Sequence, residues 1–267
     1  MSLHKLTSSE FLLAAADGKA DGVSVVNKFG RNIEIDSGVT ADIWDGGYTV
    51  ASGGTSLIWL APTAARIHTI ASDSTSDDTG STGVDTVKVH YLADWDTAEA
   101  IETVGPDDLN EGIAMTNAAV MINRMEVVPQ ATTLAGNVGK ITATAASDNT
   151  VTSIIRPLIG QTGQTCYGIP STQNLYINRL YGNMNKAGGA SALVDVALCL
   201  NPNPDTQSVA FLTKHTFGLM STGTSALTIN YAVPKKMAGP GIVKIQALSG
   251  TNDVDLSSGF DGVLITQ

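Results

Sequence analysis

The chain has 267 residues, 43% of them hydrophobic and only 15% charged, so it is long and apolar enough to fold around one large or two modest cores. Acidic residues outnumber basic ones by 25 to 15, and the net charge of −10 would repel a polyanion, so no direct nucleic-acid partner is expected. Aromatic residues make up 5%, which argues against an aromatic-lined cofactor pocket, and no cofactor is expected. No apolar run approaches the ~20 residues that span a bilayer, so no membrane partner is expected.

The N-terminal residues predict a short amphipathic helix. Thr7-Ser8-Ser9-Glu10 has the spacing of a capping box, and Gly18 is placed to end the helix. The apolar run Phe11–Ala16 between them is shorter than the ~7–15 residues of a signal-peptide core, and Glu10 stands at its front.

Residues 1–61 read as an irregular N-terminal arm, because turn residues separate isolated large side chains. Phe29, Arg31, Trp44 and Trp59 are the candidate docking residues, with each aromatic ring filling a separate pocket on a partner. Burying one large side chain contributes roughly 1.5–3 kcal/mol, so three could hold a loosely structured arm. The alternative is that these aromatics complete the core of the same chain.

Two β segments follow, at residues 62–158 and 159–267. Val87, Val89 and Tyr91 alternate with Lys88 and His90, as in a strand with one buried and one wet face. Short strands separated by turn residues predict an all-β fold of antiparallel β-sandwich or jelly-roll-like domains, either one or two. The strand candidates are 65–71, 86–92, 98–104, 119–128, 139–145, 150–156, 165–169, 174–182, 191–200, 207–214, 225–232, 241–248 and 261–266.

The search for chemistry finds no catalytic, cofactor or metal motif, and we expect no enzyme. Nucleophile-elbow spacing is absent, and the four histidines are scattered on expected wet or half-buried strand faces without zinc spacing. The acidic loop 73–85 could offer oxygen ligands to calcium, although a solvated hairpin tip looks the same. The acid pairs Asp94/Asp96 and Asp107/Asp108 could serve glycoside hydrolysis, but only Trp95 stands near them to hold a sugar. Cys166 and Cys199 lie in apolar contexts and are expected to be buried free thiols.

Several motifs along the chain resemble a family of tailed-phage virion structural proteins, many of them from phages of aquatic bacteria. The resemblance covers nearly the whole chain. Its motifs are Asn27-Lys28-Phe29-Gly30-Arg31-Asn32, Asp42-Ile43-Trp44-Asp45-Gly46-Gly47, Ala65-Arg66-Ile67-His68-Thr69-Ile70-Ala71-Ser72, Thr86-Val87-Lys88-Val89, Ile122-Asn123-Arg124-Met125, Gly139-Lys140-Ile141-Thr142-Ala143-Thr144-Ala145, Ala187-Gly188-Gly189-Ala190-Ser191-Ala192 and Gly259-Phe260-Asp261-Gly262-Val263-Leu264. The chain departs from the family at 107–111, where an Asn-Gly-Thr turn is more usual.

The resemblance implies a non-enzymatic, repetitive β-structured component of a phage particle, assembled in the host cytoplasm. Within that class we expect a capsid-decorating (cement) protein that contacts the major capsid protein or other virion proteins. Self-association into a closed homo-oligomer, a trimer, is also expected. The alternative is a tail or fibre-associated structural protein, or an adhesin that reads host glycans through loops 72–85 and 105–117.

Overall fold

The computed structural model describes residues 9–46, 58–129, 136–186, 191–205, 210–251 and 254–267. Apart from one helix, α1 (Ser9–Ala16), its regular elements are strands, and every pairing between described strands is antiparallel. The prediction of an all-β, antiparallel chain is therefore confirmed. No helix of the described residues is long and apolar enough to cross a membrane.

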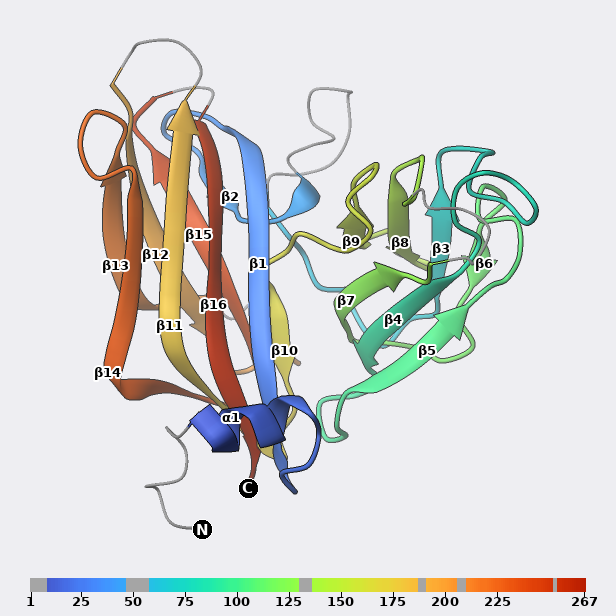
Figure 1. Ribbon diagram of the computed structural model, residues 1–267, viewed down its shortest axis with the longest axis horizontal. Coiled ribbons are helices and arrows are strands. Elements are labelled where there is room, and N and C mark those ends of the chain that lie inside the picture. The colour runs from blue at the N-terminus through green and yellow to red at the C-terminus, as the bar shows by residue number, and fades with distance from the viewer. Residues whose placement is uncertain (1–8, 47–57, 130–135, 187–190, 206–209, 252–253) are drawn as a thin grey trace.

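Two large sheets face each other on the left of Figure 1. The first has the order β1-β16-β11-β14, and the second the order β10-β15-β12-β13 with β2 also paired to β15. Their facing sides share one apolar core, to which Leu180 and Phe260 contribute from the first sheet and Leu198 and Ile245 from the second. The strands are β1 (Val23–Ile35), β2 (Thr40–Asp42), β10 (Tyr167–Ile169), β11 (Gln173–Lys186), β12 (Leu193–Asn201), β13 (Leu212–Met220), β14 (Ala226–Ala238), β15 (Gly241–Ser249) and β16 (Val254–Thr266). We call this unit the two-sheet domain.

A second unit, the inserted lobe (residues 58–165), lies on the right of Figure 1. The chain leaves the two-sheet domain after β2 and returns to it at β10, so the lobe interrupts that domain in sequence. Its two small sheets have the orders β6-β3-β8-β9 and β5-β4-β7, and they pack around a core of their own. The strands are β3 (His68–Ser72), β4 (Val87–Leu92), β5 (Ala100–Val104), β6 (Ile113–Ala114), β7 (Met121–Val127), β8 (Ile141–Ala145) and β9 (Val151–Ile155).

The described part of the N-terminal segment differs from the predicted arm. Strand β1 pairs with β16 from Val23↔Ile265 to Ile35↔Val254, and β2 pairs with β15. Both strands therefore belong to the two-sheet domain, and the division at 61/62 and 158/159 does not match the units of the structure. The β1 strand was missed because the polar stretch at 27–32 reads as turns, whereas a sheet supplies the long-range partners that sequence does not reveal.

Other local predictions are confirmed. Helix α1 ends before Gly18, whose φ of +67° suits a glycine, and it packs through Ala15 on Val23 and Val263. Cys166 and Cys199 are both buried and free. The predicted strands from 65 to 266 recur within a few residues at most ends, although β13, β14 and β16 are displaced or longer and β6 was not predicted.

We predict that deletion of residues 1–61 abolishes cooperative folding. The deletion removes β1, which is hydrogen-bonded along most of β16, and it uncovers apolar residues of the shared core. The measurement is a far-UV circular-dichroism melt of the shortened and full-length chains. A shortened chain that kept a cooperative β melt would contradict this assignment and restore the idea of a separate arm.

Candidate functional site

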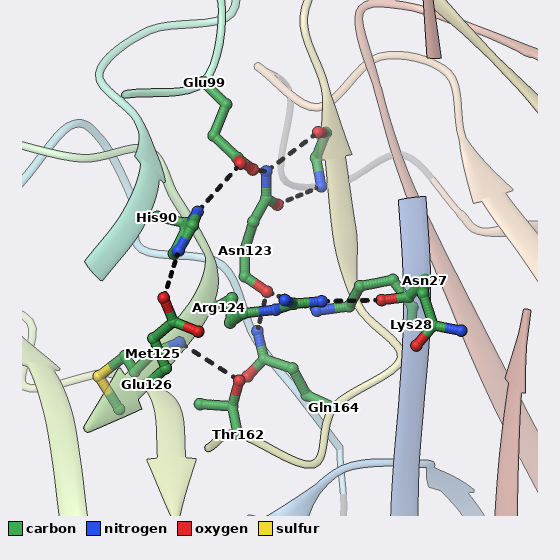
Figure 2. Close-up of polar contacts among 11 residues, drawn as sticks. Asn27, Lys28, His90, Glu99, Asn123, Arg124, Met125, Glu126, Thr162 and Gln164 are labelled. Atoms are coloured by element: carbon green, nitrogen blue, oxygen red, sulfur yellow. Dashed lines mark hydrogen bonds and ion pairs between the residues drawn. The ribbon is translucent and has the colours of Figure 1, made fainter. Parts of the chain in front are cut away.

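A cleft of about 360 Å³ opens where the inserted lobe meets the two-sheet domain. Strand β1 forms one wall, and strands β4 and β7 with the residues before β5 form the other. The polar side chains that meet here are drawn in Figure 2. We call this set of contacts the polar junction.

Lys28 of β1 is the buried amine of the polar junction. Its side chain reaches the inserted lobe, where the amine donates a hydrogen bond to the carbonyl of Asn123 on β7. Only 4% of Lys28 is exposed to solvent. Burial, helped by the nearby positive charge of Arg124, lowers its pKa from 10.5 to about 7, so the amine is partly uncharged at neutral pH.

Asn123 joins three segments of the chain. Its amide nitrogen donates to Glu99 at 2.5 Å and to the carbonyl of Gly168 at 3.4 Å, while its amide oxygen accepts the N–H of Gly168 at 2.7 Å. Gly168 belongs to β10 of the second large sheet. One buried side chain therefore satisfies backbone groups of the two-sheet domain and a carboxylate of the lobe.

His90 of β4 lies between two carboxylates at the mouth of the cleft. Its ring nitrogens stand 3.4 Å from Glu99 and 3.4 Å from Glu126 (Figure 2). The hydrogen bond with Glu99, followed by the charges of both carboxylates, raises the pKa of His90 although partial burial opposes this. The two carboxylates thus favour the protonated form of the ring.

Backbone contacts complete the polar junction. Arg124 donates to the carbonyl of Asn27 on β1 at 3.0 Å, and Gln164 donates to the carbonyl of Ile122 at 2.9 Å. The N–H of Thr162 donates to the carbonyl of Met125 at 3.0 Å. These bonds tie β7 to both β1 and the connection that leads back to β10.

The chemistry of the polar junction favours a structural role. The ionisable groups Lys28, His90 and Glu99 already have partners inside the chain. Burial raises the pKa of the nearby Cys166 thiol far above its usual range, so it is not a thiolate nucleophile at neutral pH. In the part of the chain that the structure describes, no three His, Cys, Asp or Glu side chains are gathered as metal ligands.

A second set of buried charges stands beside the polar junction, on residues 42–45. Asp42 pairs with Lys244 of β15 at 2.8 Å and accepts the N–H of Trp59 at 2.8 Å. Asp45 pairs with Arg156 at 2.7 Å and accepts the N–H of Gly163 at 2.8 Å. Burial raises the pKa of both carboxyls, that of Asp45 to about 6. We call residues 42–45 the hinge segment, because they touch both units.

The four predicted docking residues occupy different environments. Trp44 and Trp59 are buried in one core cluster with residues of both units, which is the alternative that the sequence left open. Such rings cannot reach a partner while this fold is intact. Phe29 is half-buried on β1, and Arg31 pairs with Asp255 of β16 at the surface. Docking through Phe29 and Arg31 stays a prediction.

The acidic loop 73–85 is organised around Asp77. This buried carboxylate accepts hydrogen bonds from the hydroxyl of Ser72 and from the N–H groups of Val84, Val138 and Gly139. The loop therefore uses its most buried acid to hold its own shape rather than presenting it to a ligand.

The remaining predicted groups are dispersed. Asp94 caps the backbone of residues 96 and 97, and Asp96 accepts the hydroxyl of Ser171. Asp108 accepts the N–H of Thr79, which ties the acidic loop to the next one. The histidines were expected on wet or half-buried strand faces, and His90 and His215 are half-buried on strands. The expectation is wrong for His68, which is fully buried. His4 lies outside the described residues.

Comparison with known proteins adds little to this geometry. No family model and no curated protein matches the chain. Two solved structures, of the Gt and Gx strains of infectious bursal disease virus, align over 92% of this chain and 73% and 70% of theirs, at 10% and 9% identity. Both have a TM-score of 0.19, too low to carry an argument.

We predict that Lys244→Met destabilises the fold far more than Arg31→Met. The first change leaves the buried Asp42 carboxylate without its cation, which costs about 3–5 kcal/mol. The second removes a surface pair with Asp255 in which 44% of the Arg31 side chain is exposed, and such pairs contribute about 0–1 kcal/mol. Urea unfolding gives both values, and equal losses would contradict a special role for the hinge segment.

We also predict that Lys28 gives the folding free energy a pH dependence. Between pH 7 and 10.5 the unfolded chain retains the proton that folded Lys28 has lost, so stability contributed by this residue rises with pH in that window. Relative to Lys28→Met, the wild-type chain should gain up to about 1.4 kcal/mol per pH unit above pH 7. Urea unfolding at pH 7, 8 and 9 measures this slope, with Lys19→Met at an exposed lysine as control. Parallel curves for the wild type and Lys28→Met would contradict the prediction.

Proposed function

We propose that this chain is a non-enzymatic structural subunit of a tailed-bacteriophage particle, and within that class a capsid-decorating (cement) protein. The observation that carries the proposal is that the buried charged groups between the two units have their partners inside the chain. Buried charges at the polar junction and the hinge segment are paired within the chain and fix one unit on the other. A cleft whose ionisable groups are already engaged suits a rigid building block better than a catalyst.

The facing sheets of the two-sheet domain support the finer assignment to a β-sandwich of jelly-roll-like character. A rigid sandwich with a rigid lobe can contact several neighbouring capsid subunits at once. A standard interface buries ~1,600 Å², and particle symmetry would multiply that area many times. Contacts spread in this way oppose separation of the capsid subunits under internal DNA pressure.

The proposal also includes the partners of the protein and its location. The subunit contacts itself, as a closed oligomer such as a trimer, and the major capsid protein or other virion proteins. Exposed apolar side chains at strand positions, such as Val233 and Ile101, favour self-association through β surfaces. The protein would assemble in the host cytoplasm and reside in the virion.

A tail or fibre-associated adhesin is the second candidate. It is favoured by the tip of the inserted lobe, where Asp78 accepts the N–H of Asn110 and Asp108 accepts the N–H of Thr79. Two surface loops held together in this way form a stable platform of the kind that reads a host glycan.

We predict that the protein is present in hundreds of copies per particle, within severalfold of the major capsid protein. The reason is that stabilisation by contact area requires a copy at each repeated capsid position. Quantitative mass spectrometry of purified particles measures this number. Twelve or fewer copies per particle would contradict the cement proposal and favour the tail or fibre candidate.

A further inference from the structure

Two open sheet edges lie at opposite ends of the molecule. Strands β13 and β14 each form one edge of a large sheet, and β5 forms one edge of a sheet in the inserted lobe. Figure 1 shows β13 and β14 at the left end of the long axis and β5 along the lower side of the inserted lobe on the right. No strand of the described residues covers the outer side of β5 or β14. An uncovered edge offers backbone N–H and C=O groups to another chain.

The β13–β14 end is basic, and we call it the basic edge. Residues 210–250 contain no Asp or Glu, although the whole chain carries 25 of them. Lys214, Lys235 and Lys236 lie on these strands, and none forms an ion pair with a described residue. The Lys235 amine donates to the Lys214 carbonyl at 2.8 Å, which joins the two strands. Val233 of β14 is 81% exposed.

The β5 end is acidic, and we call it the acidic edge. Residues 94–111 contain seven Asp and Glu residues and no Lys, Arg or His. Ile101 on β5 is 60% exposed. The neighbouring Glu102 accepts the N–H groups of Thr116 and Asn117, so the strand is held from one side by its own lobe. The acidic edge thus pairs an exposed apolar side chain with a dense negative charge, opposite in sign to the basic edge.

The two edges also match in length. Strand β5 has five residues. Strand β14 pairs with β11 in two stretches, Ala226–Asn230 and Lys235–Ala238, and Pro234 between them has no N–H to donate. The second stretch has four residues and carries Lys235 and Lys236, so the basic part of β14 that can accept a further strand is about as long as β5.

We propose that the basic edge of one copy docks on the acidic edge of a second copy, β14 against β5, so that subunits join head to tail. The proposal rests on the self-associating role argued above and names the surfaces that carry it. A second copy is the fitting occupant because the same chain supplies the complementary charge, edge length and apolar contact. Pairing like edges would instead oppose lysine to lysine or acid to acid, which is unfavourable. Head-to-tail contacts close into rings when the rotation between neighbours permits.

The test is a charge exchange in the full-length protein, measured by sedimentation velocity. Lys214→Glu/Lys236→Glu and Asp107→Lys/Glu111→Lys change exposed side chains of the basic and acidic edges. Each double variant alone should self-associate about tenfold more weakly than the wild type. The first makes the basic edge negative, and the second reduces the negative charge of residues 94–111, which then hold five acids and two lysines. An equimolar mixture of the two should recover pairwise association to within about threefold, because the unchanged acidic edge of the first variant meets the unchanged basic edge of the second.

The control is Lys19→Glu/Lys140→Glu, which makes the same charge change away from both edges and should associate like the wild type. Circular-dichroism melts show whether each variant is folded. Wild-type association should also weaken in ~1 M salt, where charges are screened beyond ~3 Å.

Three results would overturn the proposal. The first is a wild-type protein that stays monomeric at about 100 μM in low salt, where a specific interface of standard size should be populated. The second is a mixture of folded variants that fails to reassociate. The third is normal association of Asp107→Lys/Glu111→Lys alone, because the contact would then not involve the acidic edge. The copy number in particles is measured independently, so a failure here is distinguishable from failure of the cement proposal.

Discussion

The buried carboxylate of Asp42 is the constraint on which the arrangement of the two units depends. An ionised group can be buried only where cations and N–H groups compensate its lost hydration. Asp42 finds them on β15, through Lys244, and at the start of the inserted lobe, through the backbone of Trp59. Three residues later, Asp45 is compensated by Arg156 and by the N–H of Gly163, both of the inserted lobe. Because these partners come from both units, the hinge segment can satisfy its charges only when the units sit together.

The polar junction extends this constraint to β1. Lys28 tolerates burial because it can lose its proton, and its amine still has the Asn123 carbonyl as a partner. Asn123 in turn holds Gly168 of β10. A displacement of the lobe would leave several of these buried groups without partners at once, and each would cost about 1–3 kcal/mol. The cleft is therefore held open by its own hydrogen bonds, which makes it a joint with one favoured geometry.

Local pattern was enough to predict most of the strands and the helix, but not their association. The alternation of Val87, Val89 and Tyr91 identified β4, because burial on one face of a strand leaves a period of two in the sequence. No such signal showed that residues 23–35 pair with residues 254–266 at the other end of the chain. Trp44 and Trp59 were read as isolated anchors because turn residues separate the large side chains of residues 1–61. The acids on either side of Trp44, Asp42 and Asp45, belong to the hinge segment, whose partners lie far away in sequence.

The candidate site was missed for a related reason. Lys28, Asn123 and Gly168 acquire a shared role only through tertiary contact, and none belongs to a motif with fixed spacing. Charge distribution, in contrast, is visible in sequence and gains meaning from the fold. Residues 62–158 carry 13 acidic and 5 basic residues, a net charge of −8 out of the total −10. The fold places this negative lobe at the opposite end of the molecule from the β13–β14 hairpin, which contains no Asp or Glu (Figure 1).

The charge asymmetry of the chain has one favoured direction, because the buried pairs of the hinge segment are satisfied in one arrangement of the lobe and the sheets. Two such subunits attract when the lobe of one faces the hairpin of the other, and they repel when lobe faces lobe. The buried pairs Asp42–Lys244 and Asp45–Arg156 therefore act beyond stability. In the assembly proposed above, by favouring one direction of the negative lobe they would determine which relative orientation of neighbouring subunits is favoured. The interior chemistry of one chain would then set the geometry in which copies of that chain assemble.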